Sequence, residues 1–122
     1  MLASAGIFLH AMKIYQIDFS NEDGSQADHC CEVNNRVEAR EIADQVEKEL
    51  RVENFDDSWS AYRIEEVEPY GFYGNNGKYV LTRRPNWERL GSYDSYELVS
   101  RHCDSLNAAY KIGQIFEQVK TL

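Results

Sequence analysis

Five residues of this chain have side chains that can bind zinc or act as a nucleophile and its base: His29, Cys30, Cys31, His102 and Cys103. Zinc favours thiolate and imidazole ligands in a tetrahedral shell. Adjacent residues point to opposite faces of a strand and diverge by about 100° on a helix. Cys30 and Cys31 therefore cannot both bind one ion without distortion, and neither can His102 and Cys103. No C-x-x-C pair is present. We therefore predict no metal and no cofactor, and we interpret the cysteines as structural residues in a reducing compartment.

A Cys–His catalytic pair would need a thiolate held beside an oriented base, and no local sequence specifies such a pocket. The sequence also lacks the signatures of serine hydrolases, zinc proteases and phosphate-binding loops. We assign no catalytic residue. A small enzyme with an unrecognised site is the second alternative for function.

A basic and aromatic segment at residues 78–89 points to different chemistry. It comprises Lys78, Tyr79, Arg83, Arg84, Trp87 and Arg89, opposed only by Glu88. Arginine can bind phosphates and aromatic rings can stack on bases, so single-stranded nucleic acid is the first alternative ligand. The formal charge of the whole chain is −8, which opposes a polyanion. The simpler interpretation is an amphipathic strand whose arginines pair with the protein's own acids.

Acidic side chains are distributed unevenly along the chain. Residues 1–69 contain 16 acidic and 6 basic side chains, a net charge of −10, whereas residues 70–122 contain 5 and 7, a net charge of +2. Within the acidic part, a central helical segment carries its own arginines and lysine. The unmatched acids therefore lie on either side of that segment, and such a surface can meet a cationic partner.

We predict that the unmatched acids bind a basic surface of a protein partner. The candidate partner-binding residues are Glu22, Asp23, Asp28, Glu32, Glu53, Asp56, Asp57, Glu65, Glu66 and Glu68. They can form one surface if the segments before and after the central helix are neighbours in a sheet. The predicted function is a small, acidic, cytoplasmic, non-catalytic binding protein that acts as a regulator or inhibitor. Acidic inhibitors encoded by phages and mobile elements offer an analogy in size and charge alone.

The first half of the chain predicts a hairpin followed by a helix. Residues 13–19 alternate apolar and mainly polar side chains, which indicates a half-buried strand. Asp23 and Gly24 supply turn chemistry, and residues 27–33 can return as the second strand. Asn35 followed by Glu38 has the spacing of a capping box. The helix that follows carries one apolar face, formed by Ala39, Ile42, Ala43, Val46 and Leu50.

The second half predicts further strands and a long helix. Residues 59–68 indicate a strand with a bulge near Glu65, and Asn76–Gly77 predicts a turn into a strand at 78–83. Asp94 with Glu97 has the spacing of a second capping box. The last helix carries two apolar stripes, which predicts a break near Asp104–Ser105, a helix covered on two sides, or a homodimer interface. The stripes are Tyr96, Val99, Cys103, Leu106 and Tyr110, then Ile112, Ile115, Phe116, Val119 and Leu122.

These patterns predict a single α+β domain of approximate order ββαββα at residues 12–122, with an antiparallel sheet under two helices packed mainly on one face. We expect one core formed by Ile14 or Ile17, Ile42, Val46, Leu106 and Tyr110. Residues 1–11 are interpreted as an N-terminal extension or cloning remnant, with an edge strand as the alternative. Their apolar run is short and lacks a basic flank, so we expect neither a signal peptide nor a membrane anchor.

Overall fold

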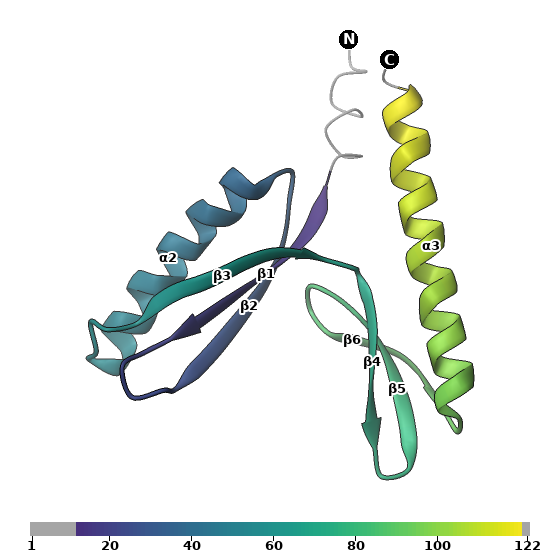
Figure 1. Cartoon of the computed structure of the whole chain (residues 1–122), viewed down its shortest axis with the longest axis horizontal. Coiled ribbons are helices and arrows are strands. Elements are labelled where there is room, and N and C mark those ends of the chain that lie inside the picture. Colours follow the sequence, from purple (N-terminus) through teal and green to yellow (C-terminus); the bar gives the residue numbers. More distant parts are fainter. Residues whose placement is uncertain (1–11, 121–122) are drawn as a thin grey trace. The chain divides into compact units, whose positions relative to one another are not determined.

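The computed structural model describes the chain over residues 12–120, with side chains through residue 115. The predicted extension at residues 1–11 lies outside the described residues. The described elements follow one another as β1 (Lys13–Ser20), β2 (Gln26–Val33), α2 (Arg36–Asn54), β3 (Ser60–Val67), β4 (Tyr70–Asn75), β5 (Lys78–Arg83), β6 (Glu88–Tyr93) and α3 (Tyr96–Lys120) (Figure 1). The α+β class and the approximate element order are confirmed.

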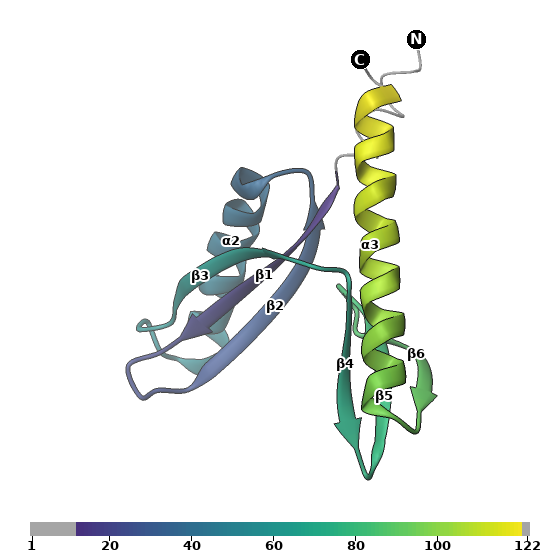
Figure 2. The same cartoon turned by 45° about the vertical axis from the view of Figure 1, so that its right-hand side comes forward.

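The strands form two three-stranded antiparallel sheets, not the single sheet predicted from the sequence. The first sheet has the order β2-β1-β3 and packs against α2, and the second has the order β4-β5-β6 and packs against α3 (Figures 1 and 2). Residues Met12–Val67 make one compact unit, here called the N-terminal unit, and the residues from Glu68 onward make the C-terminal unit. The two sheets separate at Pro69, which cannot donate a ladder hydrogen bond.

The N-terminal unit has its own core between the sheet and α2. The alternation predicted for β1 is confirmed, since Tyr15, Ile17 and Phe19 are all buried in this core. The predicted apolar face of α2 also packs there. The other members include Cys31, Val33, Trp59 and Ile64.

The first turn of α2 is capped as predicted. The Glu38 amide donates to Oδ1 of Asn35 at 3.0 Å. The Glu38 carboxylate accepts from the amide of Asn34 at 2.8 Å, one residue earlier than in the usual reciprocal box. At the other end, Phe55 closes the helix in the left-handed conformation, with φ 52° and ψ 42°.

The irregularity in β3 lies at a different residue from the predicted one. Asp18 of β1 pairs with Arg63, and the next residue, Phe19, pairs with Ala61. Tyr62 is therefore the extra residue, and the bulge expected near Glu65 is wrong. A bulge re-aims the side chain at which it occurs, and here that side chain is an aromatic ring.

In the C-terminal unit, β4 and β5 form a hairpin through Asn76 and Gly77, whose positive φ values of 53° and 80° suit a tight hairpin turn. The buried side chains of its core are Leu81, Val99 and Cys103. Asn107 ties α3 to β4, since its side chain accepts from the Tyr70 amide and donates to the Tyr70 carbonyl, both at 3.0 Å. Asn107 thereby provides a hydrogen-bond partner for both the N–H and the C=O group of Tyr70, the first residue of β4.

Two predictions for α3 are corrected. Its first turn is capped by Ser95, whose hydroxyl accepts from the Leu98 amide, while Asp94 instead pairs with Lys78. The helix is continuous through Asp104 and Ser105, so no break separates the two stripes. The first stripe supplies Val99, Cys103 and Leu106 to the core. In the second stripe Ile112 and Ile115 are exposed, and a homodimer through this face stays a prediction.

The single core expected from the sequence is divided between the two units. Ile17, Ile42 and Val46 belong to the core of the N-terminal unit. Leu106 belongs to that of the C-terminal unit. The amphipathic faces were assigned correctly, but periodicity does not specify which helix covers which strands.

Candidate functional site: the acidic end of the N-terminal unit

The uneven charge of the chain coincides with the division into two units. Residues 12–67 contain 15 acidic and 6 basic side chains, a net charge of −9, and residues 68–122 contain 6 and 7, a net charge of +1. β1 pairs with both β2 and β3, so the hairpin before α2 and the strand after it are neighbours in one sheet. The two predicted groups of acids therefore belong to neighbouring segments of one sheet, as a single acidic surface requires.

Two loops at the same end of the N-terminal unit are tied together. Asn21, in the β1–β2 turn, donates from its side chain to Oδ2 of Asp56 at 3.1 Å. The Glu22 amide donates to the Ser58 hydroxyl at 3.0 Å. That hydroxyl and the Ser58 amide both donate to Oδ1 of Asp56, at 2.6 and 2.9 Å. These bonds hold the β1–β2 turn against the α2–β3 loop, so acidic residues of two distant sequence segments lie at the same end of the unit.

We call this region the acidic end and define it by six of the predicted residues: Glu22, Asp23, Asp28, Glu53, Asp56 and Asp57. Among the described residues, none of the six forms an ion pair. Hydrogen bonds from the Ser58 side chain and backbone hold the pKa of Asp56 below its ordinary value, against a smaller opposing effect of desolvation. The carboxylate that links the two loops therefore stays charged at neutral pH.

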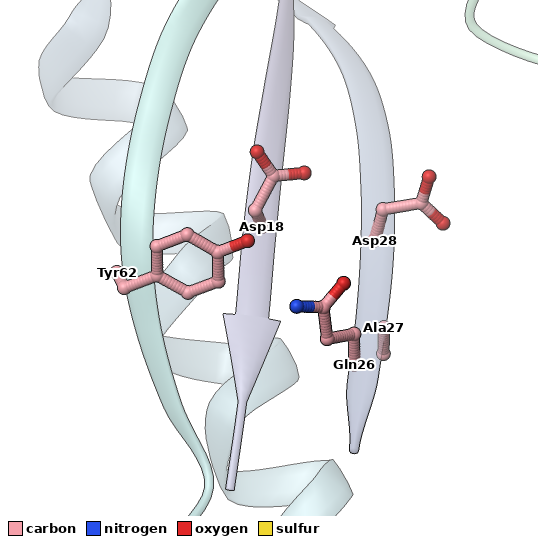
Figure 3. A pocket seen from close by; sticks show the side chains of 5 residues that line it. All are labelled: Asp18, Gln26, Ala27, Asp28 and Tyr62. Atoms are coloured by element: carbon pink, nitrogen blue, oxygen red, sulfur yellow. The ribbon is translucent and has the colours of Figure 1, made fainter. Parts of the chain in front are cut away.

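A shallow hollow of about 280 Å³ opens on the sheet beside the acidic end. It is lined by Asp18, Gln26, Ala27, Asp28 and Tyr62. Figure 3 shows the Tyr62 ring reaching from β3 toward Asp18 and the Gln26 side chain extending toward β1. Asp18 and Asp28 are directly opposite each other on β1 and β2. Two carboxylates, a phenol and an amide supply hydrogen-bond acceptors that suit a lysine or arginine side chain.

Asp18 is the buried member of this hollow, with a side chain only 10% exposed. Its carboxylate accepts from Nε2 of Gln16 at 3.0 Å and from Nε of Arg63 at 2.8 Å. Burial pushes the pKa of Asp18 upward, but these hydrogen bonds and the Arg63 charge outweigh it, and the pKa lies below its ordinary value. Arg63 is thus already bound to Asp18, while Asp28 has no such cation among the described residues.

The other four predicted acids lie outside the acidic end. Glu65 and Glu66 form ion pairs with Arg63 and Lys13, at 3.8 and 3.6 Å. Glu68 belongs to the C-terminal unit, where it pairs with Lys111 at 3.0 Å. Glu32 is opposite Ile14, toward the far end of β1 from the turn. The structure therefore brings together six of the ten predicted residues.

The basic and aromatic segment is divided by its own fold. Lys78 pairs with Asp94 at 2.6 Å, and Tyr79 packs against the core of the C-terminal unit. Arg84 donates to the Glu68 carbonyl at 2.7 Å and lies 4.8 Å from the centre of the Trp87 ring. Arg83, Trp87 and Arg89 are left exposed around the β5–β6 connection. Lys78 is exposed as well, so four of the six predicted nucleic-acid-binding residues are accessible, and of these four only Lys78 forms an ion pair with a described residue.

The two buried cysteines belong to the cores of different units. Cys31 is buried in the core of the N-terminal unit, and burial raises the pKa of its thiol. Cys103 is buried in the other unit, and there burial, with the nearby charges of Asp104 and Glu68, raises the thiol pKa. His102 contacts the Tyr93 hydroxyl through Nδ1. Over residues 12–115, no three His, Cys, Asp or Glu side chains converge as metal ligands would, and the raised pKa values leave these thiols protonated and weakly nucleophilic.

Sequence reasoning missed three side chains of this region: Phe55, Tyr62 and Gln26. Phe55 lies between Glu53 and Asp56 and does not continue the apolar face of α2. An aromatic residue outside the helical period and flanked by acids was the available signal. Tyr62 could not be recognised, because its orientation depends on the bulge.

Within the described residues, no helix has the length and apolar character needed to cross a membrane. Comparison with known proteins gives no relative: no protein-family model, no curated protein and no solved structure matches the chain.

Proposed function

We propose that this chain is a non-catalytic binding protein whose acidic end engages a basic surface of a protein partner, in a regulatory or inhibitory role. The observation that carries the proposal is the pair of tied loops, which presents carboxylates that no described cation neutralises. Two loops that are already held together by hydrogen bonds lose little backbone freedom on binding, so less of the interaction free energy is lost.

The hollow supports a specific mode of contact. A lysine or arginine of the partner can enter beside Asp28 and Tyr62, where Asp18 is already compensated by Arg63. The surrounding carboxylates then act at longer range, raising the association rate and disfavouring acidic partners.

Single-stranded nucleic acid is the second candidate ligand. Arg83, Trp87 and Arg89 are exposed in the unit whose net charge is +1, so the field that opposes a polyanion is weaker there than the charge of the whole chain implies. An exposed indole beside arginines can stack on a base while the cations contact the backbone.

The test compares two triple charge reversals with the same change in net charge. The first is Asp23→Lys, Asp28→Lys and Asp57→Lys at the acidic end. Asp56 is left intact because it links the two loops. The control is Glu41→Lys, Asp44→Lys and Glu49→Lys on exposed positions of α2. Each protein serves as bait in a native lysate, and captured proteins and nucleic acids are both identified.

We expect wild type and the α2 control to retain the same basic proteins and the acidic-end variant to lose them. Equal loss in both variants would show that only net charge matters and would contradict the proposal. Direct binding of a labelled single-stranded oligonucleotide, lost in Arg83→Glu with Arg89→Glu, would favour the second candidate.

A further inference from the structure

Two exposed apolar side chains lie at the C-terminal end of α2: Val52 in its last turn, and Phe55, the residue that closes the helix. Phe55 is 97% exposed and Val52 is 74% exposed. The Phe55 amide donates a hydrogen bond to the Val52 carbonyl at 3.4 Å, so the two residues belong to the same turn of the chain. They occupy the acidic end, with Glu53, Asp56 and Asp57 as sequence neighbours.

The fold does not need an aromatic side chain at position 55. The helix ends through backbone bonds, including one from the Asp56 amide to the Arg51 carbonyl at 3.0 Å, and any residue except proline can supply the backbone groups at position 55. The left-handed conformation at this position favours glycine or asparagine and disfavours a bulky residue. A nearly fully exposed phenyl ring contributes no core packing either.

Charge complementarity indicates what covers this patch. Carboxylates surround Phe55 in sequence, and the tie to the β1–β2 turn brings Glu22 and Asp23 to the same end. Two copies of the chain meeting here would place like-charged rims against each other, which disfavours self-association. An anionic membrane is repelled for the same reason. The remaining match is a protein surface whose apolar pocket is bordered by lysine or arginine.

We propose that Phe55, assisted by Val52, is the apolar anchor of the acidic end and inserts into an apolar pocket rimmed by basic residues on the partner. This inference rests on the proposed function and adds the shape of the complementary surface. Buried aromatic anchors surrounded by polar rims commonly dominate binding energy at protein interfaces.

The test uses two labelled peptides as probes. One is a lysine-rich peptide with a central cluster of leucines, and the other has the same lysines with each leucine replaced by serine. Wild type is expected to bind the leucine peptide at least about tenfold more tightly, as burial of one large apolar side chain allows. In Phe55→Asn this ratio should fall to about one, with the affinity for the serine peptide unchanged.

Val37→Asn is the matched control, because Val37 is also exposed on α2 but at its other end. It should keep the wild-type ratio. Phe55→Asn should melt at the same or a higher temperature than wild type, since asparagine tolerates the left-handed conformation. A lower melting temperature would assign Phe55 a structural role and overturn the inference.

Other outcomes are equally decisive. An undiminished ratio in Phe55→Asn, or no leucine preference in wild type, overturns the anchor while leaving the electrostatic proposal intact. Self-association of wild type that Phe55→Asn abolishes, measured by sedimentation, assigns the patch to a second copy instead. If the acidic-end reversal does not weaken binding of the serine peptide, the proposed function itself fails.

Discussion

Asp18 is a carboxylate with little access to water, and two side chains donate hydrogen bonds to it. Gln16 comes from the same strand, whereas Arg63 comes from β3, 45 residues away. Asp28 is opposite Asp18 on β2, and like charges in directly opposed positions destabilise a sheet. The Arg63 charge offsets this repulsion at Asp18, whereas Asp28 has no cation beside it among the described residues.

We predict that Asp18→Asn lowers the free energy of unfolding by about 2 kcal/mol near neutral pH, because charge-assisted hydrogen bonds are lost. The folded-state pKa of Asp18 lies below its ordinary value of 3.8. Its contribution is thus complete above 3.8 and is lost as the pH falls through the lower folded-state pKa. Urea unfolding of both proteins at neutral pH and near pH 3 measures this, and the difference should shrink at the acidic pH.

Asp28→Asn is the control, since it removes a charge that the described residues do not compensate. It should leave stability unchanged or slightly raised. A destabilisation by Asp18→Asn that is equally large near pH 3 would show that packing, and not charge, accounts for the effect.

At the scale of elements, α2 has two roles. Its inner face completes the core over β1–β3, and its C-terminal turn presents Phe55. The capping residue Asn35 and the αL residue Phe55 set the two ends of the helix. The position of the anchor is therefore determined by where the helix stops.

We predict that Val46→Asp destabilises the N-terminal unit by several kcal/mol, because it places a charge against the core with no partner. Thermal unfolding monitored by circular dichroism measures the effect. Val37→Asp makes the same change at an exposed position near the helix N-terminus, where a negative charge is favourable, and should have little effect. Equal melting temperatures for the two variants would place the inner face of α2 outside the core.

At the scale of the whole molecule, charge and architecture follow the same division. The N-terminal unit carries a net charge of −9, and the C-terminal unit carries +1. Each unit also has one tryptophan: Trp59 is buried in the core of the first, and Trp87 is partly exposed in the second. In Trp87→Phe, tryptophan fluorescence therefore reports on the N-terminal unit alone.

We predict that salt stabilises the N-terminal unit, because counterions screen repulsion among its carboxylates. Raising sodium chloride from very low levels to about 0.15 M should increase the Trp59 melting temperature in Trp87→Phe by about 5 °C, equivalent to about 1 kcal/mol. The acidic-end triple reversal in the same background should show a smaller increase. A salt effect of the same size in both would mean that repulsion at the acidic end does not limit stability.

The sequence by itself determined the features that depend on near neighbours. The alternation in β1, the Asp-Gly hairpin, the Asn35 cap and the apolar face of α2 could all be predicted, since each reflects a short-range period or a local hydrogen bond. The charge asymmetry is likewise a property of composition. In contrast, β6 was missed, because its residues are almost all exposed and only its pairing with β5 defines it.

Only the tertiary structure decided which of these elements act together. The division into two sheets, the tie between Asn21 and Asp56, and the pairing of Asp18 with Arg63 each join residues far apart in the chain. One bulge at Tyr62 turns an aromatic ring into the hollow, and the end of α2 leaves Phe55 in solvent. Register and long-range packing produce these arrangements, and neither is specified by hydrophobic periodicity or residue type.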